Sequence, residues 1–440
     1  MIKHFISAGF LFRSILSFSQ NNSTPVQLDS KSRLAIFMSI SQLMKDNYVE
    51  PETAIKMSNY IEKREKGGAY NYVTDPVAFS DMLTNDMYSI YHDGHLSVQY
   101  NPALEAQLLE TAASVSPAND TPPQRNINAN FGFRKVEILN GNIGYINLEH
   151  FWADKIYGKE TMKAAMQFVS HANALIIDLR NNGGGSPETV TMLCSYFFDK
   201  KIHVNDTYSR PDNSTTEFWT TPDSSLKSLT KMPLYILTSS KTFSAAEEFA
   251  YDLKNLKRAD IIGETTGGGA HNTFERPVGN GFVIYIPYGK AVNAITKTNW
   301  EKVGVKPDVQ VPAAKALETA EMNIFQNLIS KTKEEDELFE LNWQFELLKA
   351  ANNPISFDAA TLKKYAGIYS DRTFTFENGK LFYQRTGKPK FELEAMAPGK
   401  MKGKDNTYFK IEFVENKQGL VNKVKVYYQD NRIETSERTE

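Results

Sequence analysis

A serine at the start of a predicted helix is the first group in this sequence that could act as a nucleophile. Ser244 follows the predicted strand Leu234–Thr238 and a short loop, and it opens a helix predicted over residues 244–257. Open α/β sheets place their sites at the carboxyl ends of parallel strands, where free N–H groups and the helix dipole stabilise an oxyanion. Ser244 and Glu247 also form a capping-box pattern, so a purely structural role explains the same two residues.

A glycine-rich loop is the second element that could take part in binding or catalysis. Gly183, Gly184 and Gly185 follow the predicted buried strand Ala174–Leu179, and Ser186 is the predicted cap of the next helix. Glycine backbone can approach a ligand closely, and its bare N–H groups can hold a phosphate or an oxyanion. The order Gly-Gly-Gly-Ser-Pro matches neither the dinucleotide fingerprint nor the phosphate-loop lysine pattern, which makes a nucleotide site the weaker interpretation.

A serine nucleophile needs a base, and the base needs an orienting partner. His95 lies in an Asp-Gly-His turn and His271 follows a second glycine cluster, although each could equally be a surface or capping histidine. Glu301 is a candidate orienting carboxylate, with a solvated loop residue as the alternative. A Ser–Lys dyad is the rival arrangement, but residues 264–290 contain no lysine before Lys290.

Composition excludes several classes of protein. The 440 residues predict about two or three domains, and the net charge of -2 without basic runs disfavours a nucleic-acid partner. The single cysteine, Cys194, excludes a disulfide framework and is predicted to be a buried core thiol. No zinc-binding pattern is present, so we expect neither metal nor cofactor.

The first nineteen residues are expected to be a signal peptide. Lys3 gives a positive start, and Phe5–Phe18 is mostly apolar, with cleavage expected near Ser19–Gln20. Arg13 interrupts the apolar stretch, and an amphipathic helix is the alternative. No later segment approaches the roughly 20 apolar residues of a membrane span. We therefore expect an exported protein, periplasmic or extracellular, without a membrane span.

Strand–loop–helix units in series predict a parallel sheet with right-handed crossovers. The segment before these units has a helical pattern, and the tail of the chain has the pattern of short antiparallel strands. Residues 113–123 are predicted to be a loop or linker. The expected domains are a helical subdomain at 30–97, a catalytic core at 127–312, a helical linker at 313–352 and a small accessory β domain at 355–440.

Five segments carry a family resemblance, in one order along the chain: Asp93–His95, Ile177–Gly184, Thr238–Glu247, Gly263–Gly268, and Glu301 with Gly304–Asp308. Together they resemble the tail-specific (C-terminal-processing) serine peptidase superfamily. The resemblance is closest to its branch of interphotoreceptor retinoid-binding protein repeats and the tricorn core protease. It implies a crotonase/ClpP-like αβ core, with an N-terminal helical subdomain and a small C-terminal antiparallel β domain.

The resemblance also assigns roles to individual residues. It makes Ser244 the nucleophile, gives the oxyanion hole to the N–H groups of Ala245 and of Gly183 or Gly184, and makes His95 the base. Glu301 supports the site. The lysine of the dyad branch has no match here, which favours His95. The family's frequent PDZ domain is not evident either, since residues 98–130 are too few to hold one.

The expected function is therefore that of a secreted serine endopeptidase that acts on a peptide or protein by acyl-enzyme chemistry. A binding protein for a hydrophobic ligand or peptide is the first rival, because retinoid-binding relatives use the same fold. A crotonase-type acyl-CoA enzyme is the second rival. It shares the oxyanion loop but leaves Ser244 and the export signal without a role.

Overall fold

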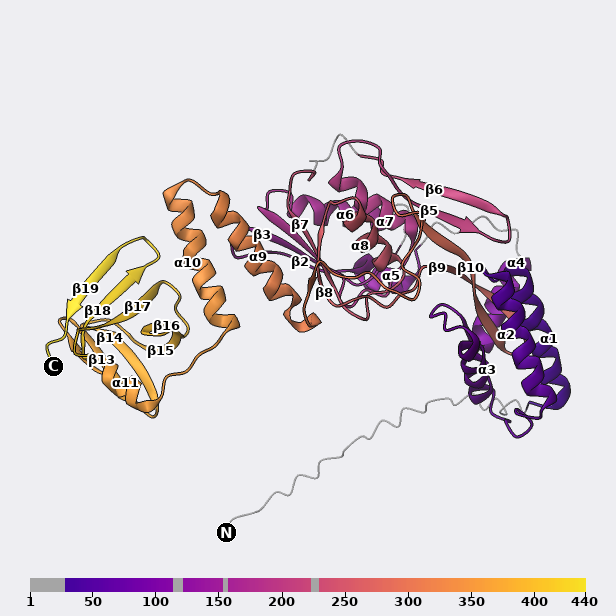
Figure 1. Cartoon of the computed structure of the whole chain (residues 1–440), viewed down its shortest axis with the longest axis horizontal. Helices are drawn as coiled ribbons and strands as arrows, with labels where there is room; N and C mark the ends of the chain where they lie inside the picture. The colour runs from indigo at the N-terminus through magenta and orange to yellow at the C-terminus, as the bar shows by residue number, and fades with distance from the viewer. Residues whose placement is uncertain (1–27, 114–121, 153–156, 223–228) are drawn as a thin grey trace, which may run out of the picture. The chain divides into compact units, whose positions relative to one another are not determined.

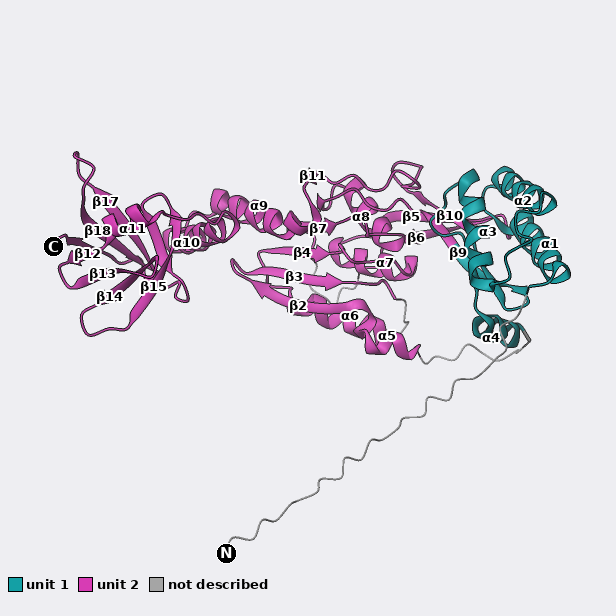
Figure 2. Ribbon diagram, turned by 90° about the horizontal axis from the view of Figure 1, so that it is seen from below, with its two compact units in different colours: residues 1–115, 273–287 teal, residues 116–272, 288–440 magenta. Residues whose placement is uncertain are grey.

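The computed structural model describes residues 28–113, 122–152, 157–222 and 229–440 (Figure 1). It divides into two compact units (Figure 2). Unit 1 comprises residues 1–115 and 273–287, and unit 2 comprises residues 116–272 and 288–440. The predicted signal peptide and most of the predicted 113–123 linker lie outside the described residues. The domain boundaries given above stay predictions.

Helices dominate unit 1, as the pattern of the first hundred residues predicts. Its elements are α1 (Ser30–Asn47), α2 (Pro51–Lys66), α3 (Pro76–Ile90), β1 (Ser97–Tyr100) and α4 (Pro102–Ala113). The side chain of Asp75 accepts hydrogen bonds from the first turn of α3, and Pro76 occupies the first helical position. Such a cap satisfies N–H groups that have no partner within the helix. The sequence therefore fixes where α3 begins.

The core of unit 1 lies between these helices and a strand contributed from much later in the chain. Ile36 and Ile40 of α1, Phe79 and Leu83 of α3, and Phe282 of β10 (Phe282–Asn293) are all fully buried. β1 pairs antiparallel with β10 within this unit. The sequence pattern predicts a strand only over Phe282–Pro287, shorter than β10, and it does not indicate α4.

A six-stranded sheet forms the centre of unit 2. Its strand order is β11-β8-β7-β4-β3-β2, parallel throughout except for the antiparallel edge strand β2. The strands are β2 (Phe133–Leu139), β3 (Ile143–Leu148), β4 (Ala174–Asp178), β7 (Leu234–Thr238), β8 (Asp260–Gly263) and β11 (Val309–Gln310). The predicted parallel αβ core is therefore confirmed.

Helices cover both faces of this sheet. On one face lie α6 (Tyr157–Phe168), α7 (Pro187–Cys194) and α8 (Ala245–Asn255), which bury the side of β4 that carries Leu175 and Ile177. On the other lie α9 (Ala316–Lys331) and α10 (Glu335–Asn352), which bury Ile176. All five residues of β4 are buried, as expected of a strand covered on both faces.

Several smaller elements complete unit 2. Strands β5 (His203–Ser209) and β6 (Ser214–Trp219) form a second sheet with β10, with which β9 (His271–Gly279) also pairs. The short helices are α5 (Gln124–Asn128), η1 (Asn130–Gly132), η2 (Ser195–Phe197) and η3 (Ala313–Lys315). Cys194 is fully buried, which confirms the prediction of a core thiol. Among the described residues, no helix is both long and apolar enough to cross a bilayer.

The last part of unit 2 is a nearly closed antiparallel barrel. After α11 (Ala359–Tyr365) its strands follow one another in chain order, and Tyr369 of the first also bridges to Arg438 just after the last. They are β12 (Gly367–Tyr369), β13 (Arg372–Glu377), β14 (Lys380–Arg385), β15 (Lys390–Ala397), β16 (Lys400–Gly403), β17 (Phe409–Glu415), β18 (Val421–Tyr428) and β19 (Ile433–Glu437). The expected antiparallel β character of this region is confirmed.

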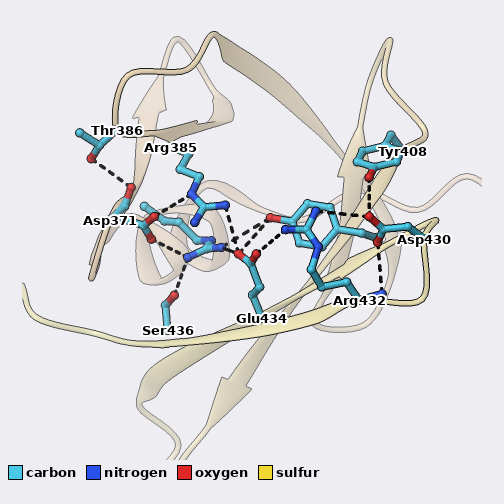
Figure 3. Close-up of polar contacts among 10 residues, drawn as sticks. Asp371, Arg385, Thr386, Tyr408, Asp430, Arg432, Glu434 and Ser436 are labelled. Atoms are coloured by element: carbon cyan, nitrogen blue, oxygen red, sulfur yellow. Dashed lines mark hydrogen bonds and ion pairs between the residues drawn. The ribbon is translucent and has the colours of Figure 1, made fainter.

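An ion-pair network ties strands of the barrel together (Figure 3). Arg372 is buried, and its guanidinium bonds to Asp371 at 2.5 Å, to Ser436 at 2.8 Å and to Glu434. Arg385 joins Asp371 at 2.7 Å. The network thus links β13, β14 and β19, where the two ends of the barrel meet.

Candidate active site

Ser244 sits at a sharp turn between β7 and α8, directly before the first helical residue, Ala245. Its backbone has φ 56° and ψ -124°, a conformation that is rare for any residue other than glycine. The preceding loop is fixed to the end of β4, since the Thr242 hydroxyl donates to the Leu179 carbonyl at 2.8 Å. Phe243 N–H donates to the Asn182 carbonyl at 3.0 Å. The turn is therefore held by its neighbours in a strained form.

The glycine loop after β4 packs directly against this turn. A Cβ atom added to Gly184, whose φ is +107°, would lie 2.7 Å from Ser244 Cβ and 2.9 Å from the Phe243 carbonyl oxygen. Only glycine fits there. A Cβ added to Gly183 would meet nothing within 4 Å, so this position borders open space. The structure thus brings together Ser244, Ala245 and the glycine loop, which follow two separate predicted strands, because those strands, β4 and β7, pair side by side.

The N–H groups around Ser244 differ in their partners. Gly184 N–H donates to Oδ1 of Asn182 at 2.8 Å, so it is already engaged within the loop. Ala245 occupies the first position of α8, where an N–H group has no acceptor within the helix. A negative charge beside Ser244 would therefore find the amino end of α8 on one side and the loop at Gly183 on the other.

The Glu247 carboxylate accepts several hydrogen bonds, of which the sequence predicted only the capping-box bond. The predicted capping box is present, with the Glu247 carboxylate accepting from Ser244 N–H at 2.9 Å. The same carboxylate also accepts from the Thr266 hydroxyl at 2.5 Å and from the N–H groups of Gly268 at 2.6 Å and Gly269 at 2.8 Å. It is fully buried, and this desolvation raises its pKa to about 7 despite the four donors.

Glu301 lies beside His271, next to the second glycine cluster, Gly267–Gly269. Its Oε2 accepts from Ala270 N–H at 2.7 Å and lies 3.8 Å from Nδ1 of His271, a side chain that is 3 % exposed. Trp300 donates from its indole N–H to the Gly269 carbonyl at 2.7 Å. A hydrogen-bonded path therefore runs within unit 2 from Ser244 through Glu247 and the glycine cluster to Glu301.

His95 belongs to unit 1, whereas Ser244, Gly183, Gly184, Ala245 and Glu301 belong to unit 2. The turn that holds it is built on Asp93, which is fully buried and accepts from the Tyr48 hydroxyl at 2.9 Å. Oδ1 of Asp93 also accepts from His95 N–H at 3.0 Å and lies 4.0 Å from Nδ1 of the imidazole. The Asp-Gly-His turn thus fixes the backbone of His95 and places a carboxylate near its ring.

The two family models that match this chain account for most of it. Residues 142–311 match the model described as peptidase family S41, and residues 28–140 match the N-terminal domain of peptidase S41 in eukaryotic IRBP. The chain therefore belongs to peptidase family S41, a serine peptidase family, as the five segments predicted.

Individual relatives are more distant. The chain is 31% identical over 175 residues to carboxyl-terminal-processing peptidase 2 of Arabidopsis thaliana chloroplasts. The matched residues are 39% of this chain and 32% of that protein. It is 28% identical over 212 residues to the carboxyl-terminal-processing protease of a Picosynechococcus strain, covering 46% of each. The solved tricorn protease is 16% identical with a TM-score of 0.42, covering 72% of this chain and 37% of that one. The chain thus spans less than half the length of these two curated relatives.

Proposed function

We propose that this chain is a serine peptidase that cleaves peptide bonds through an acyl-enzyme at Ser244. The observation that carries the proposal is the backbone of Ser244, with φ 56° and ψ -124° at a strand-to-helix turn. Hydrolases that use a serine nucleophile on an α/β sheet expose it on the same kind of sharp, strained turn. A helix cap alone gives no reason to keep a non-glycine residue in that conformation, since glycine caps nearly as well.

The proposed reaction has two steps. A base takes the proton of the Ser244 hydroxyl, and the oxygen attacks the peptide carbonyl carbon to give a tetrahedral oxyanion. We assign the oxyanion hole to the N–H groups of Ala245 and of Gly183, because the Gly184 N–H is engaged by Asn182. The amine leaves with the proton from the base, and water then hydrolyses the acyl-enzyme.

His95 is the proposed base and Glu301 its supporting carboxylate. Support for His95 comes from the family resemblance and from the lack of a matching lysine. His271 is the alternative, because it lies in the same unit as Ser244 and 3.8 Å from Glu301. Alanine variants at the two histidines separate the possibilities. We expect His95→Ala to lower kcat/KM by about 1000-fold or more and His271→Ala to have the smaller effect; the reverse order would transfer the role to His271.

The finer features predicted from the sequence are part of the same proposal. We propose a crotonase/ClpP-like arrangement of the αβ core, a peptide or protein substrate, and export directed by residues 1–19. Amino-terminal sequencing of the mature protein from the culture medium or periplasm tests export. A mature chain that begins near Gln20 is expected, and retention of Met1 in the cytoplasm would contradict it.

Labelling with a fluorophosphonate, which reacts with activated serines, tests the nucleophile. We expect the wild-type chain to be labelled at Ser244 and to hydrolyse a denatured protein such as casein, and Ser244→Ala to lose both properties. Ser240→Ala is the matched control, because Ser240 is an exposed residue in the same loop. A folded wild-type chain without labelling would favour the rival interpretation, a binding protein on the same fold.

A further inference from the structure

Two buried carboxyl groups lie one helical turn apart on α8. Glu248 is 4 % exposed and Asp252 is fully buried, and side chains four residues apart lie on the same face of a helix. Neither takes part in the site around Ser244. Acidic side chains are almost never this deeply buried unless they are paired or bind a metal ion, so this pair requires an explanation.

Two asparagines face these carboxyl groups from the second sheet. Asn205 of β5 and Asn293 of β10 are direct cross-strand partners, so their side chains point to the same face. Asn293 donates from its amide to Oδ1 of Asp252 at 2.8 Å, which shows that this face is turned toward α8. Asn205 is fully buried on the same face, and its amide lowers the pKa of Glu248.

Four buried oxygen atoms on these elements have no hydrogen-bond partner. They are Oε1 of Glu248, Oδ2 of Asp252 and Oδ1 of Asn205, together with Oγ1 of Thr207, two residues further along the same face of β5. A buried polar atom without a partner costs about 1–3 kcal/mol. Glu248 and Asp252 face Asn205 and Asn293 across the contact between α8 and the second sheet, so the unpartnered oxygens there indicate that an ion or water belongs between them.

None of the described residues brings a positive charge to these two carboxyl groups. The groups that shift the pKa values of these two carboxyls, besides each other, are Asn205, Asn293 and Glu188, and none is a cation. Burial raises the pKa of Glu248 to about 8 and that of Asp252 well above its ordinary value. Cys194 of α7 also faces the pair, and burial raises its pKa as well. Within the described residues, therefore, no side chain provides a counter-charge for these two carboxyl groups.

We propose that Glu248, Asp252 and Asn205, with Thr207, form a buried binding site for a calcium ion. The ligand atoms are all oxygens, which suits Ca²⁺ or Mg²⁺ and disfavours the nitrogen- and sulfur-seeking Zn²⁺. Two carboxylates balance one divalent charge. Ca²⁺ is the better choice because Mg²⁺ gives up its waters reluctantly, whereas Ca²⁺ accepts irregular cages built from protein oxygens. The ion would hold α8 against β5 and β10, independently of any activity at Ser244.

Thermal unfolding of the full chain tests this site without any activity assay. After dialysis against EDTA, Ca²⁺ at about 100 times its Kd should raise Tm by about 3 °C. Binding must displace protons from the carboxyl groups, so the Ca²⁺ response should be larger at pH 8.5 than at pH 6.5. Metal analysis of the chain purified without chelator should give about one calcium per chain.

Variants fix the location of the site. Glu248→Gln removes one charge with little change of shape and should abolish the Ca²⁺ response. Glu188→Gln, a matched change at a nearby exposed acid, should leave it intact. The proposal is overturned if Ca²⁺ leaves Tm unchanged at both pH values, if Glu248→Gln still responds, or if only Mg²⁺ stabilises the chain. Any of these results would mean that Glu248 and Asp252 are neutralised by protonation and not by a bound calcium ion.

Discussion

The turn that carries Ser244 has a backbone conformation that most residues avoid. Holding a non-glycine residue in such a region costs of order 1–3 kcal/mol, and here the strain falls on Ser244, the proposed nucleophile. The surrounding contacts that hold it are made by Thr242, Phe243 and Glu247. The strain at this residue lowers the stability of the folded chain, and that cost can be measured.

Two substitutions at Ser244 should separate strain from capping. Glycine adopts this φ freely and caps a helix nearly as well as serine, whereas alanine keeps the strain and loses the cap. We expect Ser244→Gly to unfold at higher denaturant than Ser244→Ala, by about 1 kcal/mol in unfolding free energy. Both should be inactive. Equal unfolding midpoints would show that the turn is not strained.

At the scale of elements, the two loop glycines differ sharply in what surrounds them. Gly184→Ala would place a methyl group against Ser244 and the Phe243 carbonyl at a positive φ, whereas the same change at Gly183 meets open space. We expect Gly184→Ala to lower the unfolding free energy by about 2–4 kcal/mol. Gly183→Ala should unfold close to wild type. Chemical denaturation of both variants measures the difference, and similar losses would contradict the packing described.

The buried acids of α8 should make the stability of the chain fall as pH rises. Glu248 ionises near pH 4.5 in the unfolded chain and near pH 8 in the folded protein, so between these values the folded state binds more protons. Its stabilising contribution is complete below pH 4.5 and is lost as pH rises through about 8. In EDTA, Glu248→Gln should flatten this dependence and be more stable than wild type at pH 9. Parallel pH profiles of the two chains would exclude this assignment.

The helices, strands and caps that the sequence predicted correctly are those whose signals lie within a short stretch of residues. The buried strands of the core and the caps at Ser244 and Ser186 were identified because their signals lie within a few residues. The strand predicted over Phe282–Pro287 is too short, because β10 continues past the proline to Asn293. β5 and β6 were missed because β6 is largely exposed and shows no clear alternation. The three further hydrogen bonds of Glu247 come from the next strand's loop, which no local pattern could place.

At the scale of the whole molecule, a buried lysine joins the barrel to the helices of the core. Lys410 of β17 is 4 % exposed, and its ammonium donates to the Trp343 carbonyl at 2.8 Å and to Glu346 at 2.9 Å. It also lies 3.9 Å from the centre of the Trp343 ring. Both partners belong to α10, so this one side chain anchors the barrel to the helical layer.

Removing that anchor should loosen the barrel without unfolding it. Lys410→Ala removes the hydrogen bond to the Trp343 carbonyl and the pairing with Glu346, a side chain that is 49% exposed. The change should cost about 1.5–3 kcal/mol, enough to expose the connection after α10 to proteases. We expect faster cleavage near residues 353–358, which limited proteolysis with mass spectrometry would detect. Lys417→Ala, in an exposed turn of the same barrel, is the control. Identical cleavage of the two variants would mean that other contacts hold the barrel.

The burial of Cys194 has a practical consequence for the two units. It is the one cysteine in the sequence, and burial raises the pKa of its thiol, so it should stay protonated and unreactive in the folded chain. Cysteines introduced at Tyr72 in unit 1 and Phe168 in unit 2, which are 94 % and 59 % exposed, would then accept nitroxide labels selectively. Electron spin resonance on that pair would report the distance between the units during turnover, in a chain that needs no prior removal of native thiols.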